Sequence, residues 1–433
     1  MQTSKWDLCL EGLRVLARIF RATVFVATTL LFLGCENEQE LESSVNDDSV
    51  EAIHKRIMTL DTHVDIHIDM ALDPRFDPGT LTEQQVDLPK MDEGGLDAVF
   101  YSVYVGQTRR TEEGYAEAKR VARRRFDAIH WMTAKYSDRI SLAETPQDAR
   151  DIYASGRKVA MIGIENAHAI GDDLSLIEEY YRRGARYMSL THNGHNDLCD
   201  SAQPDPDLGD LDQEHGGLTD FGKRVIGEMN RVGMMVDVSH TSVNCMMQAT
   251  AYSKVAPIAS HSAVYALAEH VRNLTDEQMI ALADAGGVMQ VVAYNQFIKF
   301  DPSYKESQAV ALRKVAEAHS VEEFVYEKHY GTPAFKEIYG AHLAKFPRAT
   351  VKDYVDHIDY AVELIGIDHV GIVSDFDGGG GIDGWNDATE TMNVTRELLA
   401  RGYSENEIEK LWSGNTLALW ESVNESAAEI INR

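Results

Sequence analysis

The stretch Thr59–His67 reads TLDTHVDIH, a short strand-like segment that ends in ionisable side chains. Stretches with helical periodicity separate it from further short apolar runs. Alternating strands and helices imply parallel βαβ units, and eight strands form a closed (β/α)8 barrel. The sequence therefore predicts an α/β fold of the (β/α)8 TIM-barrel type. The other seven predicted strands are Leu96–Val105, Lys158–Glu165, Ala185–His192, Gly233–His240, Ala256–His261, Gly287–Tyr294 and His369–Asp375.

Two segments depart from the minimal repeat. Asn193–Gly217 is rich in Asp, Gly and Pro, and we expect a long loop over the mouth of the barrel. Asp301–Arg348 (residues 301–348) is a polar insert with helical pieces, which we expect to act as a lid or a subunit contact. Between strands, helices are predicted over Tyr115–Lys135, Leu218–Arg231, Leu274–Ala285 and Thr350–Ile365.

Composition and charge limit the class of protein. The chain has 433 residues, 44% of them hydrophobic and 26% charged, which suits a large soluble domain with a full core. Its formal net charge of −29 argues against a nucleic-acid partner, because binding phosphates requires a cationic surface.

The first 35 residues have the pattern of an export signal. A basic start is followed by the uncharged apolar run Ala22–Leu33, which is too short to span a bilayer comfortably. The run ends in Leu-Phe-Leu-Gly-Cys, and this ending resembles a bacterial lipoprotein signal in which Cys35 is lipidated. A simple signal peptide or an uncleaved anchor is the alternative. Glu36 rather than Asp follows the cysteine, so we expect an exported chain held at the periplasmic face of the outer membrane.

The domain boundaries follow from this reading. Residues 1–35 form the signal, residues 36–50 a flexible acidic tether, and residues 51–433 the catalytic domain. Of the remaining cysteines, Cys199 and Cys245 follow predicted strands. A disulfide between them and two free thiols both stay open.

Five residues at predicted strand ends have the character of metal ligands. His63 and Asp65 are two apart on one strand, so both side chains point to the same face. Glu165, His240 and His261 end three other strands. Any one of them alone is more often structural, but parallel strands bring all five to the same end of a barrel. Imidazole and carboxylate together suit zinc, and a carboxylate can bridge two ions.

From Thr59 to Trp420 the chain resembles the membrane dipeptidase (renal dipeptidase) family, the M19 metallopeptidases among the amidohydrolase-like barrels. The segments that carry the resemblance are LDTHVDIH, GIENAH, YMSLTHNGHNDLCDSA, HGGLTDFGKRVIGEMNRVGMMVDVSH, PIASHSAVYALAEHVRNLTD, DHIDYAVELIGIDHVGIVSDFDGG and SGNTLALW.

The resemblance implies a role for each site residue. His63 and Asp65 would bind one zinc ion, His240 and His261 the second, and Glu165 would bridge the two. His192 would contact the scissile carbonyl oxygen, Arg272 the substrate carboxylate, and Asp375 would handle the proton. Tyr294 matches a substrate-contacting tyrosine of the family more loosely.

Four nearby residues are weaker candidates. His67 follows the first ligand pair, and a structural position is the favoured interpretation. His195 and Asn196 lie near His192 in the loop, where either could contact substrate. Asp377 lies two residues beyond Asp375, past the expected end of its strand.

The predicted function is a two-zinc dipeptidase in which a bridging hydroxide attacks the peptide bond of a dipeptide. The alternative is a barrel amidohydrolase acting on another amide, lactam or lactone bond of an amino-acid-derived substrate. A catalytically silent partner-binding lipoprotein would be expected to lack ligands, whereas all five are present. The sequence leaves open the preferred side chains, the stereochemistry and whether the chain forms a homodimer.

Overall fold

Eight parallel strands form a barrel in the computed structural model, which describes residues 47–329 and 331–432. Neighbours along the chain are also neighbours in the sheet, so each connection is a crossover on the outside of the barrel. Val64 bridges to Phe376 and the Asp65 N–H donates to the Phe376 carbonyl at 2.9 Å, which joins the first strand to the last. In order, the strands are β1 (Leu60–Asp65), β2 (Ala98–Tyr104), β4 (Lys158–Glu165), β5 (Ala185–Ser189), β6 (Met235–Asp237), β7 (Ile258–Ser262), β8 (Val288–Val292) and β9 (Val370–Val373).

All eight predicted strands are present, and the (β/α)8 fold is confirmed. One short strand, β3 (Ile140–Leu142), was not predicted; it pairs with β4 outside the barrel path. Except for β4, which has the predicted bounds, the strands are shorter than the apolar runs, because the runs continue into the loops at one or both ends.

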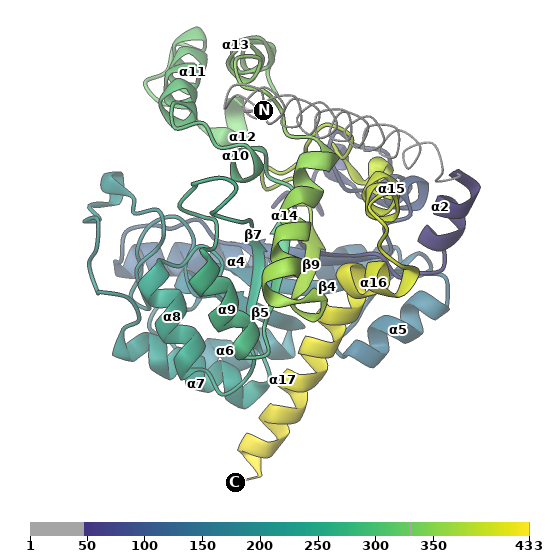
Figure 1. Cartoon of the computed structure of the whole chain (residues 1–433). Helices are drawn as coiled ribbons and strands as arrows, with labels where there is room; N and C mark the ends of the chain where they lie inside the picture. The colour runs from purple at the N-terminus through teal and green to yellow at the C-terminus, as the bar shows by residue number, and fades with distance from the viewer. Residues whose placement is uncertain (1–46, 330, 433) are drawn as a thin grey trace, which may run out of the picture.

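Helices surround the barrel, as Figure 1 shows. The four predicted helices lie where we expected, and Thr275 and Gln278 form a capping box at the start of α9. The helices are α2 (Asp47–His54), α3 (Leu88–Gly94), α4 (Glu112–Lys135), α5 (Pro146–Ala154), α6 (Ser175–Arg182), α7 (Asp220–Val232), α8 (Val243–Tyr252), α9 (Asp276–Asp284), α10 (Asn295–Ile298), α11 (Tyr304–Ala318), α12 (Tyr326–His329), α13 (Pro333–Leu343), α14 (Val351–Ile365), α15 (Met392–Ala400), α16 (Glu405–Glu409) and α17 (Asn415–Ile431).

The predicted boundary between tether and domain needs a correction. Residues 47–50 belong to α2 rather than to a tether, and Val50 is fully buried. Asp47 and Asp48 lie in the first turn of this helix, where acidic side chains are favourable, so their acidity marks the start of a helix and not a tether. The predicted signal, the lipidation site Cys35 and the rest of the tether lie outside the described residues.

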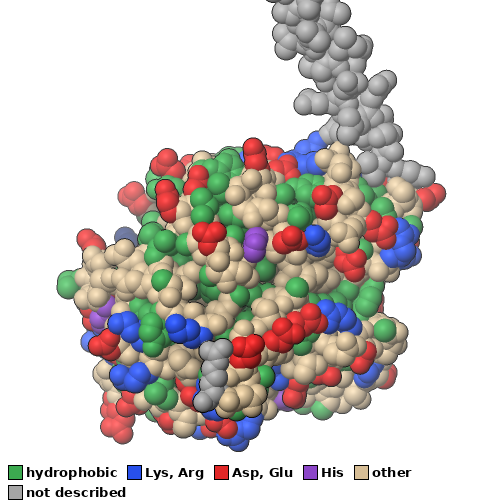
Figure 2. Space-filling model, turned by 60° about the horizontal axis from the view of Figure 1, so that its bottom comes forward, with side chains coloured by type: hydrophobic (Ala, Val, Ile, Leu, Met, Phe, Trp, Pro, Cys, Tyr) green, Lys and Arg blue, Asp and Glu red, His purple; other side chains and the backbone are tan. Residues whose placement is uncertain are grey.

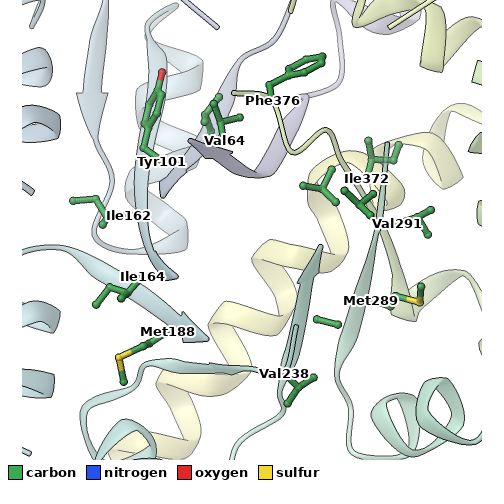
Figure 3. Packing of buried hydrophobic residues seen from close by; sticks show 14 of the residues in the cluster. Val64, Tyr101, Ile162, Ile164, Met188, Val238, Met289, Val291, Ile372 and Phe376 are labelled. Atoms are coloured by element: carbon green, nitrogen blue, oxygen red, sulfur yellow. The ribbon is translucent and has the colours of Figure 1, made fainter. Parts of the chain in front are cut away.

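Apolar side chains pack between the barrel and its helices. Figure 3 shows part of this layer, with Tyr101, Ile162, Ile164 and Met188 on neighbouring strands. A second cluster forms at the amino-terminal ends of the strands, where Trp420 of α17 packs against Phe100, with ring centres 6.1 Å apart. The strands therefore have an apolar layer beneath their carboxyl ends.

The long loop after β5 is tied to the next helix. A disulfide joins Cys199 in the loop to Cys245 in α8, with Cα atoms 6.0 Å apart, so the disulfide alternative is the one this structure contains. Ser201 of the same loop donates through its hydroxyl to the backbone carbonyls of His192 and His240.

Two further features concern the surface. On the face shown in Figure 2, acidic and basic side chains are interspersed. Within residues 47–329 and 331–432, none of the helices combines the length and the apolar character needed to cross a bilayer.

Candidate active site

The carboxylate of Glu165 lies among four histidines. Glu165 ends β4 and is 4% exposed. Its Oε1 lies 3.0 Å from His240 Nε2, 3.4 Å from His261 Nε2 and 3.6 Å from His192 Nε2. Its Oε2 lies 3.4 Å from His63 Nε2. The two oxygens of one carboxylate thus face different histidines.

Three of the histidines make a hydrogen bond through Nδ1, the ring nitrogen that faces away from Glu165. These bonds determine which nitrogen of each neutral ring carries the proton. Tyr187 donates its hydroxyl to the Thr62 carbonyl, so its oxygen accepts from His63 Nδ1 at 2.9 Å. Ser260 donates to Asp237 at 2.6 Å, so its oxygen accepts from His261 Nδ1 at 2.8 Å.

His240 Nδ1 faces the Asn193 side-chain oxygen at 3.3 Å, which completes the pattern. In the neutral form with its proton on Nδ1, each of the three rings would present the Nε2 lone pair toward Glu165. The Nε2 atoms of His240 and His261 are only 2.8 Å apart, an arrangement that a cation between lone pairs would stabilise. The donor set therefore fits metal ions.

The charges of the cluster support the same conclusion. Burial lowers the pKa of His261 to about 3, and burial with nearby Arg272 holds the pKa of His240 well below its usual value. Burial would also lower the pKa of His63, but the neighbouring carboxylates outweigh it and raise the pKa to about 10. Neutral imidazoles suit metal ligation, and the His63 position attracts positive charge.

Two further carboxylates lie beside this cluster. Asp65 is half-buried at the end of β1, and its buried Oδ1 has no hydrogen-bond partner among the described residues. Asp375 follows β9, and its Oδ1 lies 4.0 Å from His63 Nε2. Burial raises the pKa of Asp375 well above its usual value, and the charges of Glu165 and Asp65 add to that rise. Several buried carboxylates in one place require a compensating cation or a proton.

Ligand atoms in the described part of the chain form two groups that share Glu165. One consists of His63, Glu165 and His261, and the other of Glu165, His192 and His240. His261 Nε2 also lies 2.8 Å from the Nε2 of His240, the residue with which the family resemblance pairs it. Asp65 lies outside both groups. Its carboxylate and that of Asp375 both lie beside Gly378, since a Cβ added to that glycine would lie 3.2 Å from Asp65 Oδ2 and 2.4 Å from Asp375 Oδ1.

The backbone is strained at two site residues. His240 has a φ of 68° and Asp375 a φ of 61°, in the left-handed region that residues with a side chain rarely adopt. Such conformations persist where the surrounding structure imposes them, and they concentrate at functional sites.

Arg272 is buried next to the metal-ligand cluster. It is 3% exposed, its Nη2 donates to the His261 carbonyl at 3.2 Å, and its Nε has no hydrogen-bond partner among the described residues. Burial lowers its pKa to about 10, so it stays charged at neutral pH. The guanidinium lies 5.3 Å from the ring centre of Phe297, and the ring of Tyr294 lies 4.4 Å from the same phenylalanine. Arg272 and Tyr294 therefore both contact the ring of Phe297.

The weaker sequence candidates have structural positions. His67 stacks on Phe76 with ring centres 3.5 Å apart, and its Nδ1 accepts the Asp69 N–H. Both nitrogens of His195 are occupied, by the Ser201 N–H and the Leu211 carbonyl.

Asn196 and Asp377 likewise hold loops in place. The Asn196 side-chain amide donates to the Leu190 carbonyl, and its oxygen accepts the Leu198 N–H. Asp377 accepts the N–H groups of Gln85 and Val86 from the loop before α3.

Sequence reasoning missed the residues that orient the histidines, namely Tyr187, Ser260, Asp237 and Asn193. Three of these lie on strands that end in a candidate ligand, and a polar side chain on the same strand was the available signal. Gly163 on β4 makes room for one of them, because a Cβ there would lie 1.9 Å from the Tyr187 ring.

Known proteins share both the sequence and the fold. The profile of the membrane dipeptidase family (peptidase family M19) matches residues 47–433. Dipeptidase verJ of Clonostachys rogersoniana is 31% identical over 349 residues, which cover 78% of this chain and 76% of that protein. Dipeptidase aclJ of Aspergillus oryzae is 31% identical over 80% of this chain and 72% of its own length.

Two solved structures extend the comparison. The probable dipeptidase PvdM from Pseudomonas aeruginosa superposes with a TM-score of 0.77 and 31% identity, over 90% of this chain and 99% of that one. A metallopeptidase from Rhodobacter sphaeroides, liganded with a phosphinate mimic of the dipeptide L-Ala-D-Ala, has the same fold, with a TM-score of 0.65 and 22% identity over 85% of this chain and 99% of that one. With a family match over nearly the whole described chain and a histidine–carboxylate cluster at the expected end of the barrel, this protein belongs to the membrane dipeptidase family, peptidase family M19, and is a metal-dependent dipeptidase.

Proposed function

We propose that this protein hydrolyses dipeptides with two zinc ions bridged by Glu165. The observation that carries the proposal is the position of the Glu165 carboxylate. One oxygen lies within 3.4 Å of His240 and His261, and the other lies 3.4 Å from His63. A carboxylate placed in this way can share its two oxygens between two cations.

The remaining ligand would come from Asp65, whose buried and unpartnered oxygen suits coordination. Two bound zinc ions would lower the pKa of a water held between them, so that a hydroxide nucleophile is available at neutral pH.

The protein's own residues would orient the substrate and move the proton. His192, whose Nε2 lies 3.6 Å from Glu165, would donate to the carbonyl oxygen of the scissile bond as negative charge develops on it. Asp375, which burial and the adjacent carboxylates make easier to protonate, would take a proton from the nucleophile and pass it to the leaving amine.

Arg272 would restrict the substrate to short peptides. A buried guanidinium with an unpartnered N–H is well suited to a charged acceptor, and the free carboxylate of a dipeptide supplies one. In a longer peptide that position holds a neutral amide. The dipeptide mimic bound to the Rhodobacter sphaeroides relative supports the same substrate class.

The test combines metal analysis with a substrate series. Fully active protein should contain two zinc ions per chain, and it should cleave dipeptides far faster than their carboxyl-terminal amides or tripeptides. One ion or fewer per active chain would exclude the two-zinc site. Equal turnover of dipeptides, amides and tripeptides would instead favour a broader amidohydrolase.

We also propose that the chain is exported and anchored through a lipid on Cys35, at the periplasmic face of the outer membrane. The Leu-Phe-Leu-Gly-Cys pattern and the apolar run before it support this location. Replacing Cys35 with serine should move the protein from the membrane fraction to the soluble fraction. A Cys35→Ser form that remains in the membrane fraction would count against the lipid anchor.

A further inference from the structure

The residue that follows Glu165 has an unusual backbone conformation. Asn166 is fully buried, with a φ of 81° and a ψ of 103°. Residues with a side chain rarely have a positive φ, and asparagine is among the few that tolerate it. Such a conformation persists only where the surrounding structure imposes it. The chain is therefore held in a particular shape at the point where β4 ends.

The peptide group between Glu165 and Asn166 is held from both neighbouring strands. On one side, the Glu165 carbonyl accepts the N–H of Val105, the residue that follows β2, at 3.0 Å. On the other side, the Asn166 N–H donates to the hydroxyl oxygen of Ser189, at the end of β5, at 2.8 Å. Because this peptide group is bonded to the Glu165 Cα, fixing its plane restricts the direction in which the carboxylate points.

The side-chain amide of Asn166 is fully hydrogen-bonded. Its Nδ2 donates to the Val105 carbonyl at 3.0 Å and to the side-chain oxygen of Gln107 at 3.1 Å. Its Oδ1 accepts the His168 N–H at 3.1 Å and the side-chain amide of Asn196 at 3.2 Å. An amide has two N–H groups and an oxygen with two lone pairs, so its whole capacity is used. A buried polar network in which every member is satisfied is rigid.

The same network reaches the residue before His192. Ser189, which accepts the Asn166 N–H, donates its own hydroxyl to the Thr191 carbonyl at 2.9 Å. The Nε2 of His192 lies 3.6 Å from Glu165 Oε1. Asn166 therefore connects the backbone of Glu165 to the backbone beside His192.

The orientation of the Glu165 carboxylate matters because each of its oxygens faces a different histidine. Its Oε1 lies 3.4 Å from His261 Nε2, and its Oε2 lies 3.4 Å from His63 Nε2. Metal–ligand distances tolerate deviations of only about 0.2 Å. A carboxylate that serves two ions is more sensitive to rotation than one that serves a single ion, since movement toward one ion is movement away from the other.

We propose that Asn166 is a positioning residue that holds the Glu165 carboxylate in the orientation that serves two zinc ions. This inference rests on the proposed function, in which Glu165 bridges the ions. Asn166 acts through the peptide group that it shares with Glu165 and through the loops after β2 and β5. It supplies no ligand atom, because the polar atoms of its side chain are already paired.

The test uses Asn166→Gly, which removes the side-chain amide but keeps a residue that accepts a positive φ. Titration of zinc into metal-free protein should show two ions bound to the wild type. The variant should bind the weaker of the two about 10- to 100-fold less tightly. Its kcat should fall at limiting zinc and recover when zinc is in excess. Its KM for a dipeptide should stay close to the wild-type value, because Arg272 is unaffected.

Asn166→Ala is a second variant at the same position. Alanine also lacks the amide, and it disfavours a positive φ. We therefore expect weaker zinc binding in the alanine variant than in the glycine variant.

Asn415→Ala separates a loss of position from a loss of stability. Asn415 is 6% exposed, and its side-chain amide donates to the carbonyls of Ile367 and Val370, at the start of β9, at 2.7 and 2.8 Å. Removing this amide should lower the free energy of unfolding, as the loss of any buried amide would, but both zinc affinities should be unchanged.

Three outcomes would count against the proposals. If Asn166→Gly binds both zinc ions as tightly as the wild type, the positioning role is wrong and the two-zinc dipeptidase still stands. The same conclusion follows if Asn166→Gly and Asn415→Ala weaken zinc binding equally. A wild type that binds a single ion when fully active would overturn the two-zinc site, and this inference with it.

Discussion

The two ends of the barrel are built from the same strands but differ in every chemical respect. At the amino-terminal end, Leu60, Phe100 and Met161 pack into an apolar cluster that Trp420 closes. At the carboxyl end, β1 and β4 present three polar side chains, of which His63 and Glu165 are buried and Asp65 is half-buried. One strand therefore contributes to stability at its start and to chemistry at its end.

This difference separates the consequences of substitution. Burying several carboxylates and imidazoles costs stability, and the apolar end of the barrel offsets that cost. Changes at the carboxyl end should therefore affect metal content and catalysis, and changes at the amino end should affect the free energy of unfolding.

The largest effect is expected for Glu165→Gln. A neutral amide cannot bridge two cations well, so this variant should lose one or both metal ions and nearly all activity. The measurements are elemental analysis and kcat/KM on a dipeptide. His67→Ala is the matched control, because His67 follows β1 two residues after Asp65 but stacks on Phe76, and this variant should keep both ions. Loss of metal in the His67 variant would show that the polar site is larger than the cluster around Glu165.

Trp420→Ala, at the amino-terminal end of the barrel, should lower stability without affecting metal binding or catalysis. Trp420 is fully buried, and truncating such a side chain costs about 3–5 kcal/mol in the free energy of unfolding. Denaturant unfolding should record this loss, while zinc content and kcat/KM of the folded fraction stay near the wild-type values. A Trp420 variant that folds stably but binds no metal would contradict the separation of the two ends.

Arg272→Ala tests the substrate side of the carboxyl end. Losing a charge-assisted pair with the substrate carboxylate should reduce kcat/KM for dipeptides by roughly 30- to 1000-fold, about 2–4 kcal/mol. The variant should show little further loss on dipeptide amides, which already lack that charge. Its metal content should be unchanged, and a drop in metal content would make Arg272 part of the ion site instead.

Tyr187→Phe should have the smallest effect of the four and would sharpen the comparison within a single strand. The change keeps the ring that packs on Phe100, at 5.3 Å between ring centres, but removes the oxygen that accepts from His63 Nδ1. Outer hydrogen bonds of this kind are worth about 10- to 100-fold in metal affinity or activity. Competition with a chelator would measure the affinity, and an unchanged affinity would mean that packing alone orients His63.

The sequence predicted the barrel and the chemical character of its site because both depend on short-range patterns. Apolar runs of strand length identify the strands, and ligands such as His63 and Glu165 terminate them, so their meeting point follows from the fold class. Which histidines would share an ion does not follow, because a few tenths of an ångström in side-chain position decide it. His261, for example, lies as close to the Glu165 carboxylate as His63 does, at 3.4 Å.

Two other features could not be predicted from such patterns. The Ser260–Asp237 hydrogen bond that orients His261 joins neighbouring strands 23 residues apart, and no local motif specifies it. The packing of α11 against α13, in which the rings of Tyr304 and His342 lie 4.8 Å apart, also depends on tertiary contacts that the amphipathic pattern of the two helices does not specify. Asp47 and Asp48 show the opposite error, because acidic composition suggested a tether where a helix begins.

The bond between Cys199 and Cys245 has a practical consequence for anyone preparing this protein. It closes a loop of 46 residues, for which the chain-entropy relation gives a stabilisation of about 4 kcal/mol. Ser201, two residues from Cys199, holds the backbones of His192 and His240. Material made in a host with a reducing cytoplasm, or purified with a strong thiol reductant, will therefore lose rigidity at the loop that supports two of the four histidines. Activity assays on such material will underestimate the enzyme.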